Sequence, residues 1–498
     1  MSGIRVTYAG LISFIVGISS VLTGTIFTLI VTRRLTPDEF GTWNLIGSLI
    51  LYVMISEPII SYWVTRETAR GMDSGKSAVI SSGMFSAAGI FVYLIIAYFV
   101  GLQTNAHKDI LIFAVILVPV MFLNRTLTAI NLGWKPQSTS YGILAFESAK
   151  IPCGLIFVAL LHMGVFGAIV STTLAYLGSI FILIIYAKDK IKNKFKIQVL
   201  KKWLKYSWLP LYPGIGTLIF SLDVLIFSLI TRSFIGLAFY SSALAVSSLV
   251  SHSGLISQAI YPKLLGGGKK DHLQENLIRF FYFGIPLTAL SITFARPALF
   301  ALNPFYEIAV PTAIFMTIRG FVYALAGIFD QSLQGIEDVD TNEESKFKDF
   351  VKSKLFFLPT LRLSKFILYI ATLSVMLFLL QSRNVSQSDL VIYWSIILLI
   401  TEIPFAIYLY ILTRKSFELR IPSSIIIKYL LICIGVFGFT YLLIERYLEY
   451  KNNIFIFFPN VLLYIGIAMG SYLLITYFVD LRTRKLFNAI INEIRNKS

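Results

Sequence analysis

Long apolar segments separated by short polar ones dominate the chain. A helix that crosses the hydrocarbon core of a membrane needs about 20 apolar residues, and about fourteen segments reach that length between charged, Gly, Pro or Asn residues. They predict spans at about 8–32, 40–60, 77–100, 110–131, 141–161, 165–186, 208–231, 237–259, 277–295, 309–331, 364–381, 390–412, 425–444 and 457–479. The first is too long for a signal-peptide core, so we expect it to be a retained helix.

The composition supports an integral membrane protein. Of the 498 residues, 56% are hydrophobic and only 14% are charged, against roughly 25% charged residues in a soluble domain. The mean hydropathy is +0.77. The two cysteines, Cys153 and Cys433, lie inside apolar segments, which argues against a disulfide framework and against a thiolate metal site.

The charge distribution predicts the orientation. The sequence holds 43 Lys and Arg against 26 Asp and Glu, a net charge of +17. Counted loop by loop, 32 basic residues fall on one side and eight on the other, while Arg125, Lys150 and Arg319 lie inside spans. Because cytoplasmic loops carry the excess of Lys and Arg, we expect both termini in the cytoplasm. The excess charge then faces anionic head groups and not nucleic acid.

An internal repeat predicts two lobes. The residues Phe27-Thr-Leu-Ile-Val-Thr-Arg33 align with Phe227-Ser-Leu-Ile-Thr-Arg232, about 200 positions later, and such self-similarity is a mark of transporters. We therefore expect an all-α integral membrane protein of about 14 transmembrane helices, in two pseudo-symmetric six-helix lobes plus two C-terminal helices. The predicted divisions are an N-lobe at 1–187, a basic cytoplasmic linker at 188–207, a C-lobe at 208–415 and the last two helices with a tail at 416–498.

Six ionisable residues lie well inside the predicted spans: Arg125, Glu147, Lys150, Asp223, Arg319 and Glu402. Each would cost roughly 3 kcal/mol if it faced lipid, so we expect them to face an interior or one another. Glu57, which precedes Pro58 near the end of its span, can reach the interface, and we assign it no role.

The three cations predict a substrate-binding site for phosphate. Lys150 and Arg319 lie near the middle of one span in each lobe, and Arg125 lies nearer the cytoplasmic end of its span. In a water-filled cleft between the lobes such groups would give strong charge-assisted hydrogen bonds to a phosphate or pyrophosphate.

The three carboxylates have two interpretations. Asp223, Glu402 and Glu147 are candidates for binding a coupling H⁺ or Na⁺, since carboxylates inside membranes serve as relays. Alternatively they form ion pairs with the basic residues, and Glu147 shares a helix face with Lys150 three residues later.

No motif of an enzyme stands out. Gly266-Gly-Gly-Lys-Lys270 lacks the spacing of a phosphate loop, and the pair Asp338 and Asp340 lies in a charged loop that we expect to be solvated. The four histidines are scattered, so we expect no metal, no cofactor and no catalytic residue. The predicted outer loops are short, which favours a transporter over an integral membrane glycosyltransferase.

The stretch Arg33-Arg-Leu-Thr-Pro-Asp-Glu-Phe-Gly-Thr-Trp43, together with Asp223-Val-Leu-Ile-Phe-Ser228, Gly236-Leu-Ala-Phe-Tyr240 and Ile260-Tyr-Pro-Lys-Leu264, resembles the polysaccharide-export family. These are the O-antigen-type flippases of the multidrug/oligosaccharidyl-lipid/polysaccharide (MOP) superfamily, which includes the multidrug and toxin extrusion (MATE) transporters. The resemblance implies a two-lobed bundle with a cationic cavity that alternates between inward- and outward-facing states.

The leading hypothesis is therefore a flippase in the cytoplasmic membrane that carries a lipid-linked oligosaccharide outward for surface glycan synthesis. Its expected partners are that substrate, a bilayer with anionic head groups, a coupling H⁺ or Na⁺, and a glycan polymerase or glycosyltransferases. Two alternatives stay open: a cation-coupled exporter of drugs or metabolites with the same fold, and an integral membrane glycosyltransferase.

Overall fold

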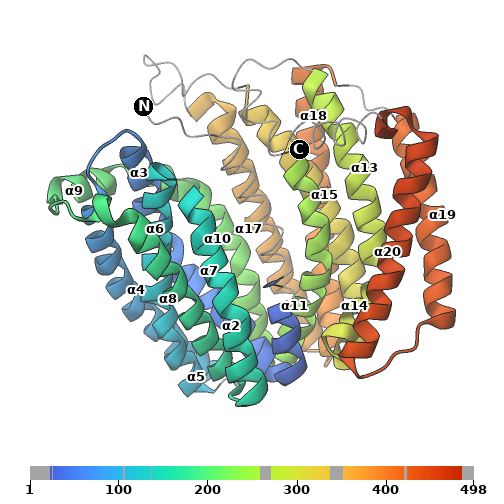
Figure 1. Cartoon of the computed structure of the whole chain (residues 1–498), viewed down its shortest axis with the longest axis horizontal. Helices are drawn as coiled ribbons and strands as arrows, with labels where there is room; N and C mark the ends of the chain where they lie inside the picture. Colours follow the sequence, from blue (N-terminus) through green and yellow to red (C-terminus); the bar gives the residue numbers. More distant parts are fainter. Residues whose placement is uncertain are drawn as a thin grey trace, which may run out of the picture. The chain divides into compact units, whose positions relative to one another are not determined.

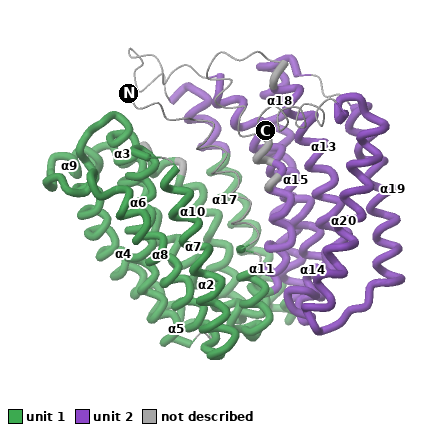
Figure 2. Tube along the Cα trace, in the orientation of Figure 1, with its two compact units in different colours: residues 1–238, 362–387 green, residues 239–361, 388–498 purple. Residues whose placement is uncertain are grey.

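The computed structural model describes residues 23–24, 26–104, 107–135, 137–257, 271–336, 351–419 and 423–484. All regular secondary structure in these ranges is helical (Figure 1). The chain divides into two compact units, residues 1–238 with 362–387 (unit 1) and residues 239–361 with 388–498 (unit 2), which Figure 2 colours separately. The predicted lobe boundaries rest on the internal repeat and not on compactness, and they stay a prediction.

Unit 1 contains the helices of the first half of the sequence. They are α2 (Pro37–Val53), η1 (Met54–Ser56), α3 (Pro58–Ala69), α4 (Gly75–Gln103), α5 (Lys108–Phe113), η2 (Ala114–Ile116), α6 (Leu117–Trp134), α7 (Gln137–Cys153), η3 (Gly154–Leu160), α8 (Gly164–Ile191), α9 (Ile197–Lys205) and α10 (Trp208–Thr231), joined by most of α17 (Lys354–Gln381).

Unit 2 contains most of the second half. Its helices are α11 (Ile235–Ser247), which begins in unit 1, η4 (Ser248–Ser257), α13 (Asp271–Thr293), α14 (Ala295–Leu302), η5 (Pro304–Ala309), α15 (Val310–Gln334), α18 (Gln387–Phe417), α19 (Ser423–Tyr447) and α20 (Ile454–Val479).

The described helices match the predicted spans closely. Eleven are long and apolar enough to cross a membrane, and α2 with α3 forms a twelfth candidate that is bent by 54°. The predicted span at 237–259 corresponds to the shorter apolar helix Ile235–Ser251, and most of the span at 8–32 lies outside the described residues, as do Gly266–Lys270 and the pair Asp338 and Asp340. The chain is thus an all-helical, multi-pass membrane protein.

Local sequence signals place the breaks between helices. Thr36 and Glu39 form a reciprocal capping box at the start of α2, with the Thr36 backbone N–H donating to Glu39 Oε2 over 2.8 Å. Pro58 starts α3 directly after the 3₁₀ turn η1, which produces the bend. Pro152 lies near the end of α7, and the chain continues as the π-helical turn η3.

The segments that follow the two copies of the sequence repeat meet inside unit 1. Gly41, which follows the first copy, packs against the backbone carbonyl of Phe234, which follows the second, and a Cβ at position 41 would collide with it. Glycine is therefore required where α2 approaches the segment that follows α10.

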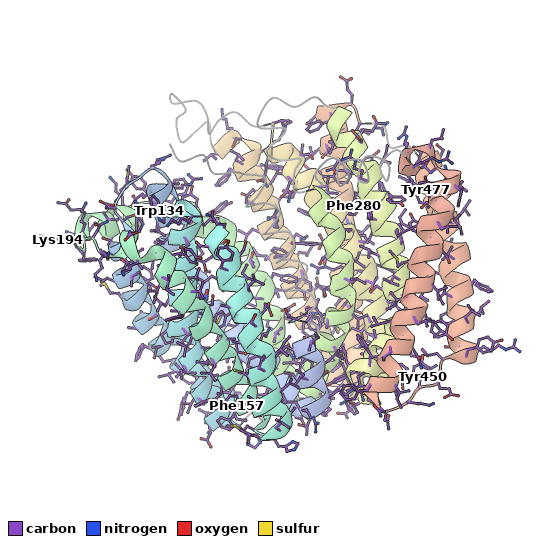
Figure 3. All side chains as sticks on the ribbon, viewed as in Figure 1. Trp134, Phe157, Lys194, Phe280, Tyr450 and Tyr477 are labelled. Atoms are coloured by element: carbon purple, nitrogen blue, oxygen red, sulfur yellow. The ribbon has the colours of Figure 1, made fainter. Side chains whose placement is uncertain are left out.

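Aromatic and apolar side chains cover both the inside and the outside of each unit (Figure 3). Trp203, Tyr93 and Phe122 are fully buried in unit 1, whereas Phe91, Leu160 and Phe181 are at least two-thirds exposed. Such exposed apolar surface is what a lipid-facing bundle requires. Trp134 and Lys194 lie at one end of unit 1, and Phe157 lies at the other.

Candidate functional site

All six ionisable residues predicted inside the membrane are described. The three carboxylates are nearly inaccessible, with 8% of Glu147, 2% of Asp223 and 2% of Glu402 exposed. Each therefore faces protein and not lipid, which is what their desolvation cost requires. Their neighbours differ between the two units.

Asp223 on α10 is held by a neutral hydroxyl and a backbone amide. Tyr369 on α17 donates its hydroxyl to Asp223 Oδ2 over 2.9 Å, and the Val224 backbone N–H donates to Oδ1 over 2.7 Å. Tyr52 on α2 donates to the backbone carbonyl of Ser221, two residues before Asp223. Three helices of unit 1 thus converge on one buried acid that can exchange a proton without losing these partners.

Glu147 and Lys150 on α7 have separate partners. Thr23 donates its hydroxyl to Glu147 Oε2 over 2.8 Å. The half-buried Lys150 ammonium lies over the ring of Phe27 at 4.6 Å and over that of Phe146 at 5.2 Å, which stabilises a cation away from bulk water. Among the described residues Lys150 forms no hydrogen bond or ion pair, so its ammonium can accept an anionic group.

Arg319 and Glu402 form an ion pair within unit 2. Arg319 Nη2 on α15 lies 3.5 Å from Glu402 Oε2 on α18, and the side chains are 16% and 3% exposed. The guanidinium also lies 4.9 Å from the centre of the Tyr323 ring. This is the interhelical pairing that was the alternative to a substrate and coupling role for these two residues. Lys150 and Arg319 belong to different units, so their joint role as a phosphate site stays a prediction.

Glu57 is the buried residue that sequence reasoning passed over. It occupies the break between η1 and α3, is 6% exposed, and has one carboxylate oxygen, Oε1, without a hydrogen-bond partner among the described residues. Ser61 donates to the other oxygen over 3.3 Å, and the exposed Arg125 on α6 interacts with the carboxylate electrostatically. The sequence signal was the pair Glu57-Pro58 inside an apolar segment, because a proline there interrupts the helix.

The partners Tyr369 and Tyr52 carried no signal in the sequence, since tyrosine is common in membrane helices and only the packing brings these two to Asp223. Among the described residues no three His, Cys, Asp or Glu side chains come together as a metal site would require.

The arrangement was compared with known proteins. A scan against protein-family models and a search of curated proteins both find no match. Solved structures do match: the lipid II flippase MurJ in an inward closed conformation has a TM-score of 0.58 at 15% identity, covering 96% of this chain and 99% of that one. An inward-facing multidrug resistance MATE transporter of the MOP superfamily has a TM-score of 0.57 at 13% identity, covering 80% of this chain and 95% of that one.

This chain has the MOP fold. An outward-facing MATE transporter also matches, with a TM-score of 0.51 at 15% identity over 83% of this chain and 95% of that one. The likeness confirms the predicted fold class, and at these identities it concerns the fold alone. The positions of Asp223, Lys150 and Arg319 inside membrane helices are observed in this chain and are not inferred from the matched structures.

Proposed function

We propose that this chain is a flippase that carries a polyprenyl-(pyro)phosphate-linked oligosaccharide across the cytoplasmic membrane by alternating access. The observation that carries the proposal is the extent of the likeness to the lipid II flippase, which leaves almost none of either chain unmatched. The MATE transporter is matched nearly completely but leaves a fifth of this chain uncovered. A flippase of a lipid-linked glycan is not an enzyme, and both termini would lie in the cytoplasm.

An apolar groove in unit 2 supports a lipid-linked substrate. It has a volume of about 470 Å³ and lies between α13, α15 and α19, where Ile285, Phe321, Ile434 and Phe437 contribute to its walls. A hydrocarbon chain gains stability from such a surface because the walls are mostly apolar and few polar groups have to be desolvated. The groove can hold part of a prenyl tail while the sugar takes a polar path.

Lys150 supplies the best-placed cation for the phosphate. Its ammonium has three donors, and aromatic rings contact it instead of a carboxylate. Arg319 would have to exchange Glu402 for the substrate, which couples substrate binding to the contact between α15 and α18. Asp223, with Glu147, would bind the coupling H⁺ or Na⁺, because its hydroxyl partner tolerates either charge state.

The test is transport by the purified protein. Proteoliposomes would contain a fluorescent, polyprenyl-pyrophosphate-linked oligosaccharide, and an impermeant quencher would report its leaflet. We expect the wild type to expose the inner-leaflet pool and Lys150→Ala to slow this roughly 10- to 100-fold, the rate equivalent of one hydrogen bond to a charged group.

Lys192→Ala is the matched control, because Lys192 is 63% exposed and pairs only with Asp189 among the described residues. It should transport like the wild type. No movement of the lipid-linked glycan by the wild type would refute the proposal, and equal rates for Lys150→Ala and Lys192→Ala would refute the role of Lys150.

The second candidate is a cation-coupled exporter of drugs or metabolites, favoured by the MATE matches and by the buried Asp223. It predicts that a cationic dye, and not the lipid-linked glycan, accumulates in the same vesicles under a pH or Na⁺ gradient.

A further inference from the structure

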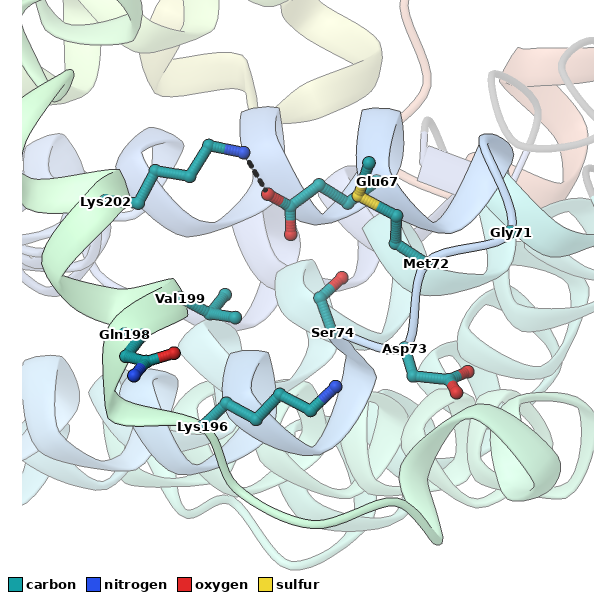
Figure 4. Close-up of a pocket in the computed structure, with 9 residues that line it drawn as sticks. All are labelled: Glu67, Gly71, Met72, Asp73, Ser74, Lys196, Gln198, Val199 and Lys202. Atoms are coloured by element: carbon teal, nitrogen blue, oxygen red, sulfur yellow. Dashed lines mark hydrogen bonds and ion pairs between the residues drawn. The ribbon is translucent and has the colours of Figure 1, made fainter.

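A second pocket lies at the lysine-rich end of unit 1, away from the buried acids. It has a volume of about 480 Å³ and lies between the end of α3, the start of α4 and α9 (Figure 4). Its polar side chains are those of Glu67, Asp73, Ser74, Lys196, Gln198 and Lys202. None of these residues has a part in the proposed transport of the glycan.

The start of α4 provides donors for an anion. This helix has 29 residues, and its N-cap residue Ser74 makes no side-chain capping bond. The Ser74 side chain is 1% exposed, and its hydroxyl has no hydrogen-bond partner among the described residues. In Figure 4 this hydroxyl lies between the Lys196 and Lys202 side chains. A long helix offers free N–H groups and a partial positive charge at this end.

The two lysines line the same pocket as this hydroxyl. Lys202 Nζ lies 3.0 Å from Glu67 Oε1, and the two side chains are 49% and 6% exposed. This pair uses one of the three donors of Lys202 and neutralises the buried Glu67. Asp73 is exposed, and its carboxylate points away from the Lys202–Glu67 pair in Figure 4. Lys196 and the remaining donors of Lys202 are thus available to a ligand.

The helix α9 has the character of a membrane-surface helix. Leu200 and Trp203 are buried against the unit, while Ile197 and Leu204 remain about half exposed. Its lysines lie on the opposite arc, and the segment 188–205 holds eight lysines in all. A short helix with an apolar edge and a lysine arc lies in the headgroup region, where the surface potential of anionic lipids favours it.

We propose that this pocket binds the phosphate group of an anionic phospholipid from the surrounding leaflet. The helix α9 brings the pocket to headgroup depth, and the phosphate would accept hydrogen bonds from Lys196, Lys202, the Ser74 hydroxyl and the start of α4. The positive-inside count predicts that this is the cytoplasmic leaflet. The proposal concerns a resident lipid and does not depend on the identity of the cargo.

The test measures lipid-dependent stability of the full chain. The protein would be placed in phosphatidylcholine nanodiscs with an increasing fraction of phosphatidylglycerol, and the melting temperature would be recorded along with lipids retained in native mass spectrometry. We expect phosphatidylglycerol to raise the melting temperature and to be retained. Lys196→Ala should weaken its apparent affinity about tenfold, the loss of one charge-assisted hydrogen bond.

Lys201→Ala is the matched control, because it removes the same charge from α9 at an exposed position that does not line the pocket. Ser74→Ala is a second pocket variant that leaves the Lys202–Glu67 pair in place and should also weaken retention. Equal weakening by Lys196→Ala and Lys201→Ala would overturn the proposal in favour of general surface attraction. Equal protection by inorganic phosphate in phosphatidylcholine alone would overturn the lipid as the source of the phosphate.

Discussion

The carboxylates inside the membrane helices have different partners in the two units. In unit 1 Asp223 accepts from the Tyr369 hydroxyl and from the Val224 backbone N–H, and Glu147 accepts from the Thr23 hydroxyl. In unit 2 Glu402 forms an ion pair with Arg319. A hydroxyl partner remains satisfied whether the acid is charged or neutral, whereas an ion pair opposes protonation because it would leave a cation alone. Unit 1 is therefore better suited to a proton-binding acid, whereas the ion pair in unit 2 holds its carboxylate more firmly.

The ion pair in unit 2 should produce the largest effect. Arg319→Ala leaves Glu402 buried without this partner, and such changes cost about 3–5 kcal/mol of unfolding free energy. We expect a large fall in melting temperature in detergent. The double variant Arg319→Leu with Glu402→Leu should recover much of it, because no unpaired charge remains. A single variant as stable as the wild type would show that the pair is not what secures α15 to α18.

Replacement of Asp223, the buried acid of unit 1, should reduce transport more than it reduces stability. Asp223→Asn keeps the size of the side chain and can still accept from Tyr369, so we expect nearly normal folding. Coupled transport should fall roughly 10- to 100-fold, because an amide cannot take up the coupling proton and no longer carries the charge that a coupling cation would contact. Transport under an imposed ion gradient gives the measurement, and Tyr369→Phe should cause a smaller loss. If Asp223→Asn unfolds the protein as Arg319→Ala does, the contrast between the units fails.

The sequence predicts the membrane spans and the buried charges, but it does not predict the partners of those charges. The spans follow from apolar length alone, which is why eleven of the predicted segments reappear as helices of membrane-crossing length. The presence of charges in the interior also follows, because lipid exposure is too costly. Their partners do not follow, since Asp223 and Tyr369 are separated by 146 positions. The burial of Glu57 was not predicted, because it depends on the bend at Pro58. The angle of that bend is set by the packing of the helices.

The contact between the end of α20 and the start of α19 allows a test that depends on pH and should show a smaller effect. Asp480, which follows α20 and is 6% exposed, accepts from Lys428 over 3.1 Å and from Tyr429 over 2.9 Å. Burial raises the pKa of Asp480, but hydrogen bonds from Thr483, Lys428 and Tyr429 outweigh it and hold the pKa below its ordinary value. The carboxylate therefore adds stability above its unfolded pKa of about 3.9, and this contribution disappears as the pH falls through the lower folded value.

Asp480→Asn should cost about 1–3 kcal/mol near neutral pH, the range for a hydrogen-bonded charged group. The gap in melting temperature between wild type and variant should narrow as the pH approaches 3. Asp189→Asn is the matched control, because Asp189 is 71% exposed in its pair with Lys192. A gap that stays constant with pH would show that the lost interaction is steric and not ionic.

We expect the smallest effect for an ion pair of the same residue types, Arg and Glu, that is exposed to solvent. Arg296, half exposed, lies 2.8 Å from Glu307 and 3.5 Å from Glu445, and the hydrogen bond to Glu307 raises the pKa of Arg296. We expect Arg296→Gln to change the unfolding free energy by only about 0.2–1 kcal/mol, and less at high salt, because solvent and ions screen exposed pairs. Melting temperatures at low and high ionic strength provide the measurement. A loss of unfolding free energy as large as that of Arg319→Ala would mean that burial does not explain why the two ion pairs differ. The comparison between acids held by hydroxyl groups and acids held in ion pairs would then lose its physical basis.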